Sequence, residues 1–86
     1  MFAPTAFVLM NTSVGSEKDV LRELHKVEGI EEAFTLYGAY DIIARVESES
    51  MEHLKQTITW NIRKMDNVKT TITMIVDAKK GVSSTL

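Results

Sequence analysis

Cysteine is absent from this chain of 86 residues, which excludes a disulfide framework and thiolate metal sites. The absence fits a reducing compartment, so we expect a cytoplasmic protein. Proline occurs once and no tract has low complexity, so we expect order except at the ends. No apolar run approaches the ~20 residues of a membrane span, and the N-terminal MFAPTAFVLM lacks a signal peptide's basic region. We therefore expect no membrane partner.

A surplus of positive charge is missing as well. The formal net charge is −2 and the sequence pI is about 5.6. A protein that holds nucleic acid alone usually carries a basic stripe, whereas the basic doublet here, Lys79–Lys80, lies near the C-terminus. We predict no direct contact with nucleic acid. With 44% hydrophobic and 26% charged residues, the composition is typical of a globular domain, assigned here to residues 1–86 with a tail from residue 78.

Apolar periodicity predicts two helices and four strands. One helix lies between Ser16, a candidate N-cap, and Gly29, a stop signal. A longer helix begins near Ser50, with an inward stripe of Met51, Leu54, Ile58, Ile62 and Met65. Apolar and β-branched runs predict strands over residues 6–11, 31–37, 40–47 and 67–76. Gly38 and Ala39 are predicted to form a two-residue loop, with glycine where a type II′ turn requires a positive φ.

The order of these elements, βαββαβ, arises from an internal repeat. The segment VEGIEEAFTL from Val27 matches MDNVKTTITM from Met65, 38 residues later, whereas Ser16 matches Ser50, 34 residues later. The difference is about one helical turn, so the second helix should be one turn longer. A duplicated split βαβ unit of this kind predicts an α+β, ferredoxin-like fold. Its four-stranded antiparallel sheet carries both helices on one face.

The uncovered sheet face bears on self-association. Strict alternation predicts one set of side chains facing the helices: Val8, Met10, Phe34, Leu36, Ile42, Ala44, Val46, Ile72, Met74 and Val76. It leaves another set on the opposite face: Phe7, Leu9, Thr35, Tyr37, Ile43, Arg45, Thr71, Thr73 and Ile75. The second set is half apolar, which indicates either a partly polar exposed face or packing of sheet against sheet. We expect a homodimer through Phe7, Leu9, Tyr37, Ile43, Arg45 and Ile75.

The residue pattern contains no catalytic constellation. His25 and His53 stand alone on polar helix faces, and no paired carboxylates or phosphate-binding loop occur. We therefore predict a protein that is not an enzyme and has no cofactor or metal. A cofactor-free, monooxygenase-like dimer stays open as an alternative, although no histidine or tryptophan lies on a predicted core strand. Trp60 falls on the outer side of the second helix and is a candidate partner contact.

Two segments carry a family resemblance. LYGAYDIIARV, with Gly38, Ala39, Tyr40 and Asp41 entering the third strand, and MDNVKTTITMIV resemble the amino-acid-binding module of the Lrp/AsnC transcription regulators. The resemblance covers residues 6–78, with asparagine replacing a glycine at Asn67. Full-length members carry an N-terminal helix-turn-helix domain, so this chain resembles a stand-alone module. The resemblance implies dimers through the sheets, assembly of these dimers into rings as higher oligomers, and a free amino acid bound where dimers meet.

That resemblance suggests a ligand site at the hairpin. The Asp41 carboxylate could accept a hydrogen bond from a ligand ammonium group, with backbone groups of Gly38, Ala39 and Tyr40 nearby. The hydroxyls of Thr71 and Thr73 could add contacts. Alternatively, Asp41 satisfies only backbone donors of its own turn. The leading hypothesis is an amino-acid-sensing, oligomerising regulatory domain; the runner-up is a pure oligomerisation module. In either case a helix-turn-helix homologue is a candidate partner.

Overall fold

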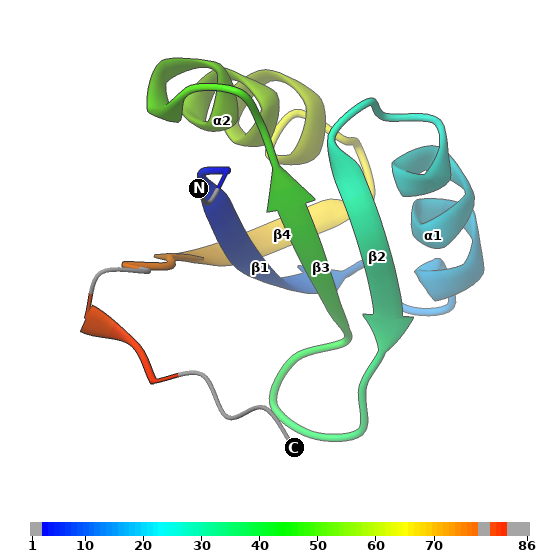
Figure 1. Cartoon of the computed structure of the whole chain (residues 1–86). Coiled ribbons are helices and arrows are strands. Elements are labelled where there is room, and N and C mark those ends of the chain that lie inside the picture. The colour runs from blue at the N-terminus through cyan, green and yellow to red at the C-terminus, as the bar shows by residue number, and fades with distance from the viewer. Residues whose placement is uncertain (1–2, 78–79, 83–86) are drawn as a thin grey trace.

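The computed structural model describes residues 3–77 and 80–82, so most of the predicted tail lies outside the described residues. The elements are β1 (Thr5–Thr12), α1 (Glu17–His25), β2 (Ile30–Thr35), β3 (Ile42–Glu47), α2 (Met51–Thr57), the π-helix η1 (Ile58–Ile62) and β4 (Val68–Ile75). The strands form one antiparallel sheet in the order β2-β3-β1-β4. Both helices lie on one side of it (Figure 1). The predicted ferredoxin-like fold is confirmed.

The hydrophobic core lies between the sheet and the two helices. Every second residue of the central strands β1 and β3 is buried, as alternation predicted. These side chains pack with buried residues of the helices and of the start of β4. The core consists of Ala6, Val8, Met10, Val20, Leu24, Ile42, Ala44, Val46, Leu54, Ile58, Ile62 and Val68. Among the described residues, no helix is long and apolar enough to cross a membrane.

The second helix is longer than the first, as the repeat predicted. α2 has 7 residues and continues directly into the 5 residues of η1, against 9 residues in α1. In the continuation Arg63 N donates to Ile58 O at 3.0 Å, a π-type bond spanning five residues. Ser50 is confirmed as an N-cap because its hydroxyl accepts from His53 N at 3.0 Å. Met51, predicted to face inward, is 40% exposed in the first turn.

The edge strands β2 and β4 each contain a β-bulge. The pairing of β2 with β3 shifts between Ile30 and Glu32, which leaves Glu31 as an extra residue. The pairing of β4 with β1 shifts in the same way: Val68 pairs with Thr12 and Thr70 with Asn11, so Lys69 is extra. Glu31 and Lys69 are equivalent positions of the internal repeat. The two halves of the internal repeat therefore share the β-bulge as well as the order of their elements.

These bulges overturn the predicted faces of β2 and β4. Ile30 and Val68 point toward the core at the strand starts, but each bulge reverses the alternation that follows. Phe34, Ile72 and Met74, predicted to face the helices, lie on the opposite side because they pair with Ile43, Leu9 and Phe7. Conversely, the helix side receives residues predicted on the uncovered face: Thr35, Thr71, Thr73 and Ile75. Leu36 and Tyr37 follow the end of β2, and Val76 follows β4.

A glycine permits the tight entry into β2. Gly29 has φ +100°, and a Cβ there would lie 3.1 Å from Glu47 O. Its carbonyl accepts from Glu47 N at 2.9 Å, which joins the entry of β2 to the end of β3. Any other residue would combine an unfavourable backbone conformation with a contact against backbone.

We therefore expect Gly29→Ala to lower the free energy of unfolding by roughly 2–3 kcal/mol, from backbone strain plus the contact with Glu47 O. Gly38→Ala is the matched control, because Gly38 also has a positive φ but open space around it. It should cost about 1 kcal/mol less. Urea unfolding at one fixed protein concentration measures the free energy of unfolding of both variants. An equal decrease in the two would show that the close contact with Glu47 has no energetic effect.

Candidate functional site

The connection between β2 and β3 is longer than the sequence predicted. β2 ends at Thr35 and β3 begins at Ile42, so the loop spans residues 36–41 rather than two residues. Leu36 N donates to Asp41 O at 2.8 Å and closes the loop at its base. Gly38 has φ +148°, so the prediction that glycine is needed there for its backbone conformation holds, although the turn is not a two-residue one. Tyr37 is fully exposed at the tip.

Asp41 links this loop to the end of β1. Its backbone N donates to Met10 O at 2.9 Å. Its Oδ2 accepts from Thr12 N at 2.8 Å and from Thr12 Oγ1 at 3.3 Å. The carboxylate thus replaces a strand partner at the point where the β1–β4 pairing shifts. Oδ1 accepts no hydrogen bond from the described residues, so one oxygen keeps its capacity for another donor.

The residues predicted to bind the ligand do not all lie close together within one chain. Gly38, Ala39, Tyr40 and Asp41 share the loop, but Thr71 and Thr73 lie on the helix side of β4. β1 separates β4 from β3, so the backbones of Thr71 and Asp41 are about 10 Å apart in the sheet. Sequence analysis did not identify Thr12 as the partner of Asp41, 29 residues away. The available signal was a hydroxyl residue at the end of one predicted strand and an aspartate at the start of another.

The open face of the sheet carries two ordered rows of side chains. One row is apolar across all four strands: Phe34, Ile43, Leu9 and Ile72. The neighbouring row is half ionic and half apolar: Glu32, Arg45, Phe7 and Met74. Phe34 is 57% exposed, Met74 46% and Ile72 44%. Of the predicted interface residues, Phe7, Leu9, Ile43 and Arg45 lie on this face, whereas Ile75 lies on the other side and Tyr37 in the loop.

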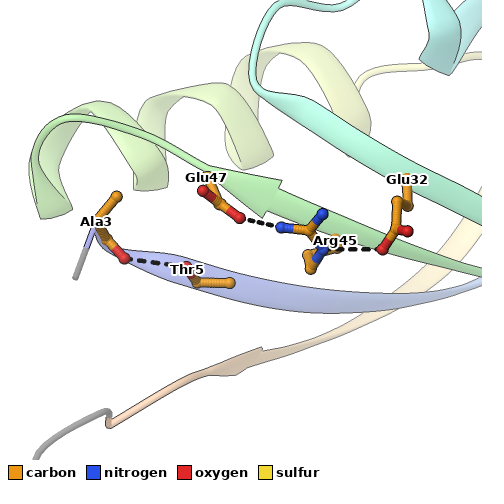
Figure 2. A network of polar contacts seen from close by, with 5 residues as sticks. All are labelled: Ala3, Thr5, Glu32, Arg45 and Glu47. Atoms are coloured by element: carbon orange, nitrogen blue, oxygen red, sulfur yellow. Dashed lines mark hydrogen bonds and ion pairs between the residues drawn. The ribbon is translucent and has the colours of Figure 1, made fainter.

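Arg45 holds its two acidic neighbours in place on the open face (Figure 2). Its Nε donates to Glu32 Oε2 at 2.9 Å, and its guanidinium also pairs with Glu47. The hydrogen bond to Glu32 is the main cause of a raised Arg45 pKa, and the nearby carboxylates of Glu47 and Glu31 add to it. Arg45 therefore stays charged and paired, which lowers the cost of covering this part of the face.

The remaining candidate residues lie apart from the loop. Trp60 is 64% exposed on η1, on the outer side as predicted, and Lys64 Nζ lies 5.0 Å from its ring centroid. His53 Nδ1 is hydrogen-bonded to Ser48 Oγ, and His25 is exposed on α1. Within the described part of the chain, no three acidic, histidine or cysteine side chains are grouped so as to hold a metal ion.

The role of Asp41 in the fold can be measured separately from any ligand. Asp41→Ala should lower the free energy of unfolding by roughly 1–3 kcal/mol, because Thr12 N loses its acceptor. Asp41→Asn should cost less, since the amide oxygen can still accept from Thr12. Asp66→Ala, in an exposed loop, is the control and should be nearly neutral. Chemical unfolding of the three variants checks this; a neutral Asp41→Ala would show that the bonds to Thr12 are energetically unimportant.

A known protein family matches most of this chain. The family model described as the Lrp/AsnC ligand binding domain matches residues 5–79. The uncharacterized HTH-type transcriptional regulator PF0250 of Pyrococcus furiosus is 28% identical over 74 residues, covering 83% of this chain and 49% of that protein. The chain therefore spans about half the length of this curated relative.

Solved structures share the fold. The crystal structure of FFRP-DM1 is 42% identical, with a TM-score of 0.82 over 85% of this chain and 97% of that one. The hypothetical protein PHS023 from Pyrococcus horikoshii is also 42% identical, with a TM-score of 0.81 over 85% and 88%. The regulator NMB0573 from Neisseria meningitidis, solved as an L-Met complex, is 14% identical, with a TM-score of 0.79 over 96% and 55%. This chain belongs to the Lrp/AsnC family, and residues 5–79 correspond to its ligand-binding domain.

Proposed function

We propose that the protein is an amino-acid-sensing regulatory domain that self-associates through the open face of its sheet and catalyses no reaction. The observation that carries the proposal is the combination of a ligand-binding family domain with an exposed loop in which Asp41 Oδ1 accepts no hydrogen bond from the described residues. A free amino acid offers an ammonium group to such an oxygen. The proposed location is the cytoplasm, where a regulator related to transcription factors would act.

The ligand itself would lie between copies of the chain. A zwitterion has two charges, and each is costly to desolvate unless it is paired or hydrogen-bonded. One copy offers the Asp41 carboxylate and the backbone of Gly38, Ala39 and Tyr40, but Thr71 and Thr73 are too far away on the same copy. A second copy is therefore needed to complete the set of partners. The L-Met named in the Neisseria complex makes methionine a reasonable first ligand to test.

A pure oligomerisation module remains the second candidate. The observation that favours it is the engagement of Asp41 Oδ2 with Thr12, which gives this residue a sufficient structural role without any ligand. In either case we propose a helix-turn-helix homologue as a partner, because the HTH-type regulator PF0250 contains a segment similar to this chain. Its sheet could pair with the open face of this chain in a mixed dimer.

Self-association is tested on the apolar row. Leu9→Arg should weaken the dimer by about 3 kcal/mol or more, a hundredfold or more in dissociation constant, because an unpaired charge would be buried. Val14→Arg is the matched control, since Val14 is fully exposed in the loop before α1. Sedimentation equilibrium should show a dimer for wild type and Val14→Arg and a folded monomer for Leu9→Arg. A monomeric wild type at micromolar concentration would refute the sheet dimer.

Ligand binding is tested by thermal shift with each of the twenty amino acids, since a ligand that binds only the native state raises the unfolding midpoint. For any ligand found, Asp41→Asn should weaken binding by roughly 1.5–3 kcal/mol, because the charge is lost while the shape is kept. Calorimetry measures the affinity of the wild type and of Asp41→Asn for the ligand. Equal affinities would show that the ligand binds elsewhere. If no amino acid binds the wild type at millimolar concentration, the oligomerisation module is the better account.

A further inference from the structure

The last residue of β1 is a threonine at a position where the pattern of the strand favours an apolar side chain. Every second residue of β1 is buried, and the earlier members of this set, Ala6, Val8 and Met10, belong to the hydrophobic core. Thr12 completes the set and is 9% exposed. Burial of a hydroxyl is unfavourable unless a hydrogen bond compensates it. The partner of this hydroxyl therefore indicates its role.

That partner is the carboxylate of Asp41, in the loop proposed to contact the ligand. Thr12 Oγ1 donates to Asp41 Oδ2 at 3.3 Å, and Thr12 N donates to the same oxygen at 2.8 Å. The bond from Thr12 N already satisfies the backbone donor at the end of the strand, so the fold does not require the hydroxyl. A valine has nearly the same shape and suits a strand at least as well. The hydroxyl is thus an addition to the structural link.

The backbone of Asp41 is fixed independently of its side chain. Asp41 N donates to Met10 O at 2.9 Å, and Leu36 N donates to Asp41 O at 2.8 Å. The freedom that remains to the residue is rotation of the carboxylate about the side-chain torsions. Two donors from Thr12 on Oδ2 restrict this rotation, while Oδ1 accepts no hydrogen bond from the described residues. The orientation of Oδ1 is therefore set before any cation approaches.

We propose that Thr12 is a positioning residue for amino-acid binding, because its hydroxyl and its N–H hold Asp41 so that Oδ1 accepts a hydrogen bond from the ammonium group of the amino acid. This inference rests on the proposed function and adds a residue to the same site. A group that is fixed in its bound orientation loses less conformational entropy on binding, so it binds more tightly than a mobile one. Thr12 itself touches no ligand and acts through Asp41.

Thr12→Val tests the inference, because it removes the hydroxyl and keeps the backbone bond to Oδ2. Calorimetry with L-methionine, and then with the other nineteen amino acids, measures the effect on binding. The affinity should fall roughly threefold to tenfold, the equivalent of one hydrogen bond. Thr12→Ser keeps a hydroxyl and should retain nearly the wild-type affinity. Thr5→Val is the matched control and should bind like wild type, since the Thr5 hydroxyl donates to Ala3 O at the other end of β1 (Figure 2).

Three further measurements separate positioning from a general effect on the fold. The urea midpoint of Thr12→Val should stay close to that of the wild type at the same protein concentration, because Thr12 N keeps its acceptor. Without ligand, the Hα–Hβ coupling constants of Asp41 in NMR spectra should report one side-chain rotamer in the wild type and averaging in Thr12→Val. The deaminated analogue of L-methionine, which lacks the ammonium group, should bind more weakly and show no difference between the two proteins.

The outcomes distinguish this inference from the proposed function. An amino acid that binds the wild type, loses affinity in Asp41→Asn and binds Thr12→Val as tightly as the wild type would overturn the inference alone. Coupling constants of Asp41 that are already averaged in the wild type would do the same. An equal loss of affinity for L-methionine and its deaminated analogue would show a general disturbance instead of a lost ammonium contact. If none of the twenty amino acids binds the wild type, the proposed function fails and this inference fails with it.

Discussion

The two β-bulges, at Glu31 and Lys69, are the constraint on which the surfaces of this molecule depend. Each lies at the start of an edge strand, after a residue that reaches the core, and each reverses the alternation that follows. As a result Phe34, Ile72 and Met74 turn away from the helices and extend the apolar surface of the two central strands. Without the bulges the same sequence would place threonines there. The outcome is a sheet with a core on one face and an apolar row across the other.

The central part of the fold could be predicted from sequence because its signals are local and regular. β1 and β3 alternate strictly, so Val8, Ile42 and their neighbours were placed correctly in the core. Ser50 and the apolar stripe of α2 identified the second helix. The prediction of the edge strands failed because the sequence does not mark the extra residue. Ile30 and Phe34 are four residues apart, so strict alternation places both on one face, and only the bulge at Glu31 separates them. Only the internal repeat hinted at the second bulge, since Glu31 and Lys69 occupy equivalent positions.

The candidate site was predicted less completely. The glycine requirement at residue 38 follows from backbone chemistry and was found. The hydrogen bonds between Asp41 and Thr12 were not predicted, because they join residues 29 positions apart and depend on where β1 ends. The same geometry explains why Thr71 and Thr73 are separated from the loop: the phase reversal in β4 moves them to the helix side. Asp41 therefore forms structural hydrogen bonds through Oδ2, while Oδ1 accepts no hydrogen bond from the described residues. The structural role is thus compatible with the proposed contact to a ligand.

The central claim is that the open sheet face is covered by the same face of a second copy. The most direct measurement is an isotope-filtered methyl NOE experiment on a sample mixed from labelled and unlabelled chains, in which cross-peaks arise only between copies. The account predicts peaks among the methyl groups of Leu9, Ile43, Ile72 and Met74 and from these to the ring of Phe34. Intermolecular peaks confined to residues of α1, α2 or η1, with none from the apolar row, would contradict it.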